Sequence, residues 1–253
     1  MIVKTMRIFA AGVMLVVSSC DQKSATDATV SQAQAVVAKR TTPAAPVPSR
    51  DWTQIIVATP EGGYRMGNPN AKVKFLEYAS LNCPHCRDFN KESADEIRRM
   101  VAGGQISYEF RTFAIDWRDL PVSSLVHCMP PSAFFRTVDA LYGSQQEWGA
   151  AYFKVDPDKM KAIQTLPPNQ QLSKLGDIAN LADFFKLRGV PRAKYESCLS
   201  DPNAVTKLQK MNELATTKYK LQGTPTFVLN DSTVPDLHTW PQVKAAIEAA
   251  VRA

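Results

Sequence analysis

The stretch Asn82-Cys83-Pro84-His85-Cys86 decides how this chain folds and which chemistry it can perform. It follows an apolar run at 73–78, which predicts a β-strand, and it precedes apolar residues at helical spacing, which predict a helix over about 84–101. Proline is favoured just inside a helix start, because its missing N–H would be unpaired there anyway. We therefore expect Cys83 to lie at the N-terminus of this helix.

Cys83 is expected to be an acidified thiol. Free N–H groups and the positive end of the helix dipole favour an anion at a helix N-terminus. His85 can add a positive charge or a hydrogen bond beside the sulfur. Such surroundings lower the pKa of a Cys-x-x-Cys thiol from about 8.5 to roughly 3.5–7.5. A stable thiolate stabilises the reduced pair, so the disulfide of Cys83 and Cys86 becomes a stronger oxidant.

A zinc half-site has the same Cys-x-x-Cys spacing and is the first alternative. Zinc would need two further ligands, but the other Cys and His residues form neither a second Cys-x-x-Cys nor a His pair at ligand spacing. A purely structural disulfide is the second alternative, but so short a loop restricts the unfolded chain little. The spacing favours a redox-active disulfide of Cys83 and Cys86, with no metal and no other cofactor.

The composition argues against a nucleic-acid-binding protein. The 253 residues carry a formal net charge of +6, and no stripe of Arg and Lys interleaved with aromatic residues is present. The length suits one sizeable domain with appendages.

The first residues are typical of an export signal. Two basic residues precede an apolar run at 8–17, which is too short to span a bilayer as a helix. Val17-Ser18-Ser19-Cys20 then resembles the lipobox of bacterial lipoproteins, in which the cysteine is acylated. A conventional cleavage nearby, leaving Cys20 as an incidental thiol, is the alternative. We expect 1–19 to be a signal peptide and 20–51 to be a flexible tether to a periplasmic domain.

The rest of the chain predicts an α/β domain over 52–253. A strand at 52–57, a strand at 72–79, the helix at 84–101 and a strand at 105–113 give a β–α–β arrangement. A helical insertion follows over about 120–220. The chain then closes with a strand at 226–229 and a helix at 239–251.

The second informative stretch is Gly223-Thr224-Pro225-Thr226-Phe227, which opens the last strand. Only about 5–6% of X–Pro bonds are cis, so the sequence by itself favours a trans Pro225. The two motifs, the strand before the first and the long helical insertion between them together resemble the DsbA family of exported thiol–disulfide oxidoreductases. The resemblance covers roughly residues 52–253.

This resemblance implies a thioredoxin-like fold with Pro225 in the cis form, packed across from Cys83. It implies that the backbone of Thr224 pairs with substrate, and that Glu77 is a buried acid beneath the redox pair. Strand alternation independently places Glu77 on an apolar face, where the pKa of a carboxyl should rise and the group can shuttle a thiol proton. An ordinary ion pair of Glu77 is the alternative, although Lys74 points to the other face.

Four cysteines remain when Cys20 is set aside, and they allow three pairings. Pairing Cys83 with Cys86 leaves Cys128 with Cys198, and some DsbA-like proteins carry such an extra bridge. An oxidising compartment would permit this disulfide. Two buried, reduced thiols are the alternative.

We expect a monomeric enzyme that oxidises reduced exported proteins and is reoxidised by a membrane redox partner. A reductase or isomerase of the same fold is one alternative, and a non-catalytic chaperone or adaptor is another. Two departures from the enteric DsbA type bear on the oxidising strength. Thr224 stands in place of Val, and Asn90 stands in place of a second acid on the active-site helix.

Overall fold

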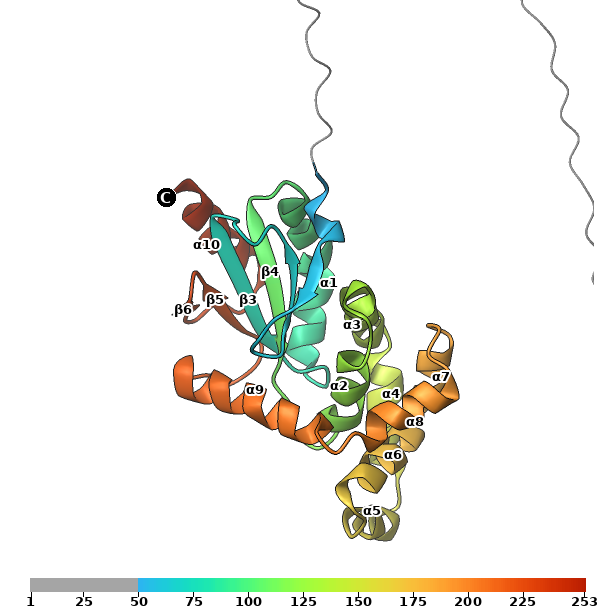
Figure 1. Ribbon diagram of the computed structural model, residues 1–253. Coiled ribbons are helices and arrows are strands. Elements are labelled where there is room, and N and C mark those ends of the chain that lie inside the picture. Colours follow the sequence, from blue (N-terminus) through green and yellow to red (C-terminus); the bar gives the residue numbers. More distant parts are fainter. Residues whose placement is uncertain (1–49) are drawn as a thin grey trace, which may run out of the picture. The chain divides into compact units, whose positions relative to one another are not determined.

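A six-stranded mixed sheet runs through residues 50–253, which are the residues that the computed structural model describes (Figure 1). The strand order is β1-β2-β4-β3-β5-β6, in which β3 and β4 are parallel and the other neighbours are antiparallel. The strands are β1 (Ile56–Ala58), β2 (Tyr64–Gly67), β3 (Val73–Ala79), β4 (Ile106–Thr112), β5 (Thr226–Leu229) and β6 (Ser232–Val234).

Helices cover both faces of this sheet. Helix α1 (Pro84–Ala102) joins the parallel strands β3 and β4, and it packs with α10 (Trp240–Arg252) on the face that holds Phe75 and Ala79. Alternate residues of β3 face the other side, where Tyr78 packs in a smaller cluster with residues at the end of α9 (Ala204–Lys218). Strand β3 is therefore central to both layers, and its C-terminal end leads directly into the Cys-x-x-Cys motif.

The predicted helical insertion is present between β4 and β5. It contains α2 to α9, and Figure 1 shows α5 to α8 grouped away from the sheet, while α9 returns along one end of it. The remaining helices are α2 (Asp119–His127), α3 (Phe134–Gly143), α4 (Gln145–Ala151), α5 (Pro157–Gln164), α6 (Pro168–Ile178), α7 (Leu181–Lys186) and α8 (Arg192–Ser200), with short 3-10 turns η1 (Trp52–Gln54), η2 (Pro131–Ala133) and η3 (Tyr152–Lys154).

A disulfide joins Cys128, which caps the end of α2, to Cys198 in α8. The Cα atoms lie 5.9 Å apart and the two residues are separated by 70 positions. The pairing that the sequence predicted is therefore present, and it connects the end of the first helix of the insertion, α2, to α8.

The pairing of β5 with β3 brings the two sequence motifs together. These strands are antiparallel, with Tyr78 opposite Thr226, so the start of β5 lies beside the end of β3. Thr224 and Pro225 immediately precede β5, and Cys83 follows β3 by a short loop. Motifs that are about 140 positions apart thus meet at one end of the sheet.

Four elements differ from the sequence-based expectations. The strand predicted at 52–57 is a 3-10 turn followed by β1, because Asp51 caps the turn by accepting from the Thr53 N–H at 3.0 Å. Strand β2 was not predicted, since its four residues lie between Gly-containing turn signals. Helix α6 and the edge strand β6 were also missed.

The expected signal peptide, the acylated Cys20 and the tether up to residue 49 lie outside the described residues. Within residues 50–253, no helix combines the length and the apolar composition that a membrane span requires.

Candidate active site

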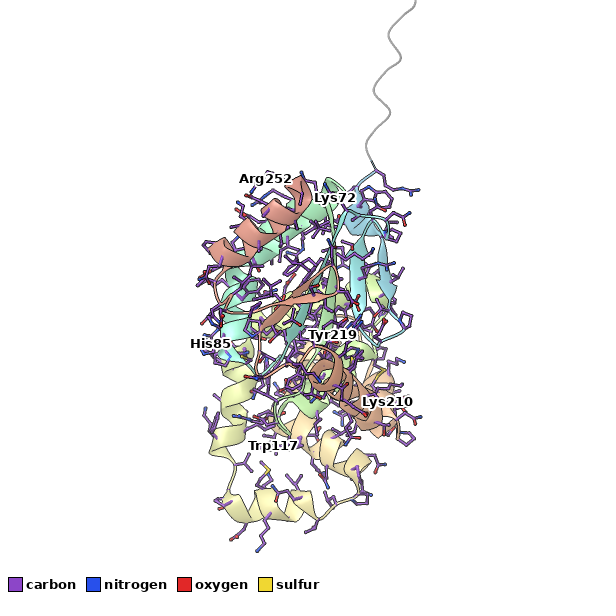
Figure 2. The ribbon with its side chains drawn as sticks, turned by 90° about the vertical axis from the view of Figure 1, so that its left-hand side faces the viewer. Lys72, His85, Trp117, Lys210, Tyr219 and Arg252 are labelled. Carbon is purple, nitrogen blue, oxygen red and sulfur yellow. A yellow bond between two sulfur atoms is a disulfide. The ribbon has the colours of Figure 1, made fainter. Side chains whose placement is uncertain are left out.

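Cys83 and Cys86 lie at the start of α1, as predicted. Cys83 is the residue that precedes the helix, Pro84 is the first helical residue, and Cys86 is in the first turn. Both are free thiols in this structure, with 5% of Cys83 and none of Cys86 exposed to solvent. Figure 2 shows the neighbouring His85 about halfway down the domain, well away from Lys72 and Arg252 at the top of the view.

Three groups of donors stabilise the thiolate of Cys83. The Cys86 thiol donates to its sulfur, the Thr224 side chain contributes a further hydrogen bond, and the backbone N–H groups of Cys86 and His85 point at the same atom. Together they lower the pKa of Cys83 to about 5, although partial burial opposes them. The helix start therefore supplies the acidified thiol that its sequence predicts.

His85 acts on the Cys83 sulfur through its backbone N–H, and its side chain is exposed. Pro84 is likewise exposed and serves as the first residue of the helix.

Cys86 has the opposite character to Cys83. Burial raises its pKa well above the ordinary value of a thiol, and the adjacent Cys83 and the Glu77 carboxylate raise it further. One sulfur of the pair is thus held as a thiolate while the other is held as a thiol.

Thr224 and Pro225 face the first thiol. The peptide bond between them is cis, and the Cys83 thiol donates to the Thr224 carbonyl oxygen at 3.3 Å. A groove of about 860 Å³ opens beside this point. It is lined by His85, Thr224 and Pro225, together with residues of the 218–227 segment and the 233–238 segment.

Glu77 lies on the apolar face of β3, as strand alternation predicted, and is only 2% exposed. Its Oε2 accepts a hydrogen bond of 2.6 Å from the Tyr108 hydroxyl. Burial raises the pKa of Glu77 to about 7; the Tyr108 hydrogen bond opposes this rise and the nearby Cys83 adds to it. A carboxyl that titrates near neutral pH next to a thiol pair is suited to proton transfer.

A buried carboxyl that the sequence analysis did not identify holds the loop before Cys83. Asp119, at the start of α2, is fully buried and accepts hydrogen bonds from the Ser80 hydroxyl, the Asn82 N–H and the Ile115 N–H, all within 3.0 Å. Burial raises the pKa of Asp119 to about 6, although these hydrogen bonds oppose the rise.

Two further side chains of the helical insertion complete this support. Gln145 donates from its amide to the carbonyl oxygens of Leu81 at 2.8 Å and of Cys83 at 2.9 Å. The Tyr142 hydroxyl donates to the Ser80 carbonyl oxygen at 3.1 Å. The insertion therefore fixes the backbone that positions Cys83, and no local sequence signal marks these residues.

An acid from another helix lies beside Asn90 of α1. Asn90 donates from its side-chain amide to Asp139 of α3 at 3.1 Å, and Asp139 also pairs with Arg98.

Among the described residues, no three His, Cys, Asp or Glu side chains lie together in a way that would hold a metal ion.

This arrangement of a Cys-x-x-Cys at a helix start, opposite a cis-proline, defines a thioredoxin-type redox site. The family model described as Thioredoxin matches residues 59–249, about three quarters of the chain, so the chain belongs to the thioredoxin family. A helical insertion lies between β4 and β5, and solved DsbA-like structures share the fold of this chain.

Proteins with similar sequences are named as protein-disulfide oxidoreductases. A Rickettsia bellii protein, whose name proposes a protein-disulfide oxidoreductase, is 25% identical over 188 residues, which are 74% of this chain and 63% of that protein. The chain thus spans less than two thirds of that relative, and 53% of a Rickettsia prowazekii one.

Solved structures share the fold. A protein-disulfide isomerase from Novosphingobium aromaticivorans superposes with a TM-score of 0.72 at 28% identity, covering 76% of this chain and 98% of that one. Wolbachia pipientis alpha-DsbA1 superposes with a TM-score of 0.60 at 22% identity, covering 74% of this chain and 90% of that one.

Proposed function

We propose that this protein is an exported thiol–disulfide oxidase that introduces disulfides into reduced polypeptides. The observation that carries the proposal is the asymmetry of the pair: the pKa of Cys83 is lowered to about 5, whereas that of Cys86 is raised. A stable Cys83 thiolate stabilises the reduced protein relative to the disulfide, so the oxidised pair tends to accept electrons.

The reaction transfers two electrons from substrate to protein. A substrate thiolate attacks the Cys83 sulfur of the oxidised pair, the Cys83–Cys86 bond breaks, and Cys86 leaves and takes a proton. A second substrate thiolate then attacks the substrate sulfur of the mixed disulfide. Cys83 leaves as a thiolate, and the substrate holds a new disulfide.

Three groups around the sulfurs support these steps. The Thr224 carbonyl lies 3.3 Å from the Cys83 sulfur, where an extended substrate segment can pair with the backbone. The adjacent groove, lined in part by His85 and Pro225, offers space for residues that flank the substrate cysteine. Glu77, with a pKa of about 7, can supply the proton that Cys86 takes and accept it back.

Substitution of Cys83 tests the proposal. Cys83→Ser should abolish both the protein's oxidation of a reduced, unfolded test protein and its catalysis of insulin reduction by dithiothreitol. Cys86→Ser cannot form the Cys83–Cys86 disulfide. Mixed with a disulfide-containing test protein, it should instead accumulate the mixed disulfide formed by attack of Cys83, because the thiol that would release it is missing; mass spectrometry detects this adduct. Persisting activity in Cys83→Ser would show that Cys83 is not the sulfur that exchanges with substrate.

A reductase or isomerase is the second candidate. The isomerase named among the solved structures and the Thr at position 224 favour it. Trapping of thiols in living cells separates the two, because an oxidase is found mainly as the Cys83–Cys86 disulfide and a reductase or isomerase as the dithiol. A non-catalytic adaptor would give a Cys83 pKa close to that of a model thiol.

We also propose that Cys20 is acylated, that 20–51 tethers a monomeric domain in the periplasm, and that a membrane redox partner reoxidises it. Metabolic labelling with a fatty acid, compared between the wild type and Cys20→Ser, tests the anchor. Absence of label in the wild type would contradict it.

A further inference from the structure

Glu77 is sealed from solvent, so any proton that it exchanges with Cys86 needs a route to the surface. Its Oε1 atom has no hydrogen-bond partner among the described residues, and its Oε2 atom is bonded to the Tyr108 hydroxyl at 2.6 Å. A proton moves between groups in hydrogen-bond contact. Tyr108 is therefore the group next to Glu77 on such a route.

Tyr108 also lines a small buried cavity between β4, α1 and α3. The cavity has a volume of about 10 Å³, which is close to the minimum for one water molecule. Ser93 of α1 lines the same cavity, is 1% exposed, and has a hydroxyl with no partner in the described part of the chain. A buried hydroxyl left unpaired is destabilising, so a water bound at Ser93 is favoured.

The outer wall of this cavity is formed by polar side chains that reach the surface. Asn90 donates to Asp139 at 3.1 Å, and Asp139 forms an ion pair with Arg98. The side chains of Asp139 and Arg98 are each 31% exposed. Asn90 and Asp139 also line an open surface hollow of about 600 Å³, so they separate the buried cavity from solvent.

We propose that Tyr108, one water molecule bound at Ser93, and Asp139 carry protons between Glu77 and solvent in each redox cycle. This inference rests on the proposed function, in which Glu77 exchanges a proton with Cys86. It assigns Tyr108 and Asp139 a part in proton transfer, and Ser93 the positioning of the water.

The proton balance is simple when the pair is reoxidised. The S–H bond of Cys86 breaks and an O–H bond forms on Glu77. The Glu77 proton then passes to the Tyr108 oxygen as Tyr108 gives its own proton to the water. The water gives a proton to the Asp139 carboxylate, which releases it to solvent. No electrons move along this route, and it runs inward when Cys86 is reduced.

The charges around the route fit these roles. Burial raises the pKa of Tyr108 well above its ordinary value, and the Glu77 carboxylate adds to this, so the hydroxyl stays protonated and acts as a relay. Asp139 and Arg98 act on Tyr108 from the outer side with opposite sign. Burial also raises the pKa of the Asp139 carboxyl, which makes proton uptake easier near neutral pH, while Arg98 opposes this.

The test follows the reduced protein as oxidised glutathione reoxidises it, by rapid acid quench and mass spectrometry. Attack by Cys83 forms a mixed disulfide with glutathione, and attack by Cys86 then releases it. Ser93→Val, which fills the cavity, and Asp139→Asn should each slow the second step about tenfold or more without slowing the first. Ser93→Ala, which leaves room for the water, should slow it less. Glu92→Gln, an exposed change on the same helix, is the control.

Comparison with Glu77→Gln separates the route from the function on which it rests. If Glu77→Gln slows the second step while Ser93→Val and Asp139→Asn leave it within twofold of wild type, the route is wrong and the role of Glu77 stands. If Glu77→Gln also leaves the step unchanged, Glu77 does not exchange a proton with Cys86. A substitution of Ser93 or Asp139 that slows both steps to the same extent would indicate a structural disturbance and would contradict the route.

Discussion

Replacing Glu77 with Gln should reduce the loss of folding stability that the wild-type protein undergoes as the pH rises from about 4.5 to about 7. The carboxyl has a pKa of about 7 in the folded protein and about 4.5 in the unfolded chain. A raised pKa means that the folded state favours the protonated form. The stability associated with Glu77 is thus fully present below about pH 4.5 and is lost as the pH rises to about 7 and above.

The size of this loss follows from the difference between the two pKa values. A difference of about 2.5 units corresponds to about 3 kcal/mol, at roughly 1.36 kcal/mol per unit. Gln has nearly the same shape as Glu, carries no charge at any pH, and can accept from the Tyr108 hydroxyl. The free energy of unfolding of Glu77→Gln relative to wild type should therefore rise by about 3 kcal/mol between pH 4 and pH 8.

Urea unfolding of the reduced proteins at the two pH values measures this change. The same reductant in every sample keeps the state of all cysteines equal between variants. Glu92→Gln, an exposed carboxyl lost from α1, should stay within about 0.5 kcal/mol of wild type at both pH values. A Glu77→Gln effect of the same size at pH 4 and pH 8 would refute the raised pKa and the reasoning from burial.

Three other changes probe the surroundings of the thiols and the insertion. Thr224→Val should raise the pKa of Cys83, because the Thr224 side chain contributes a hydrogen bond that lowers it; thiolate absorbance against pH measures this. Gln145→Leu leaves two loop carbonyls without their amide donor and should lower the free energy of unfolding by about 1–3 kcal/mol, with a decrease in Cys83 reactivity toward an alkylating reagent. Replacing Cys128 and Cys198 together by Ala should cost roughly 4 kcal/mol in urea unfolding while insulin reduction persists.

The elements nearest the redox motif could be predicted from local sequence. Strand β3, helix α1 and strand β4 each have a clear apolar pattern, and the place of Cys83 follows from Pro84 at the helix start. Alternation along β3 was sufficient to place Glu77 on the core face. Its partner Tyr108 depends on the register between β3 and β4, which local patterns do not determine.

The support of the active-site loop could not be predicted from local patterns. Asp119 and Gln145 lie 37 and 64 positions from the loop atoms that they bind, and their roles depend on how the insertion packs. An isolated Asp or Gln in a helical segment is usually a surface residue. Strand β2 was missed because four residues between turn signals give too short a pattern to establish alternation.

The lowered pKa of Cys83 has a direct consequence for the reduction potential. At pH 7, ionisation stabilises the reduced form of a thiol with a pKa of about 5. The stabilisation is about two pKa units larger than for a thiol that titrates near 9. This is about 3 kcal/mol, which raises the potential of the two-electron couple by roughly 60 mV.

Equilibration of the Cys83–Cys86 pair with glutathione redox buffers at pH 7 tests the central claim most directly. We expect a potential well above the value of about −270 mV that is typical of thioredoxin, and in the direction of about −120 mV for DsbA. A value at or below that of thioredoxin would contradict the proposal that this protein oxidises its substrates.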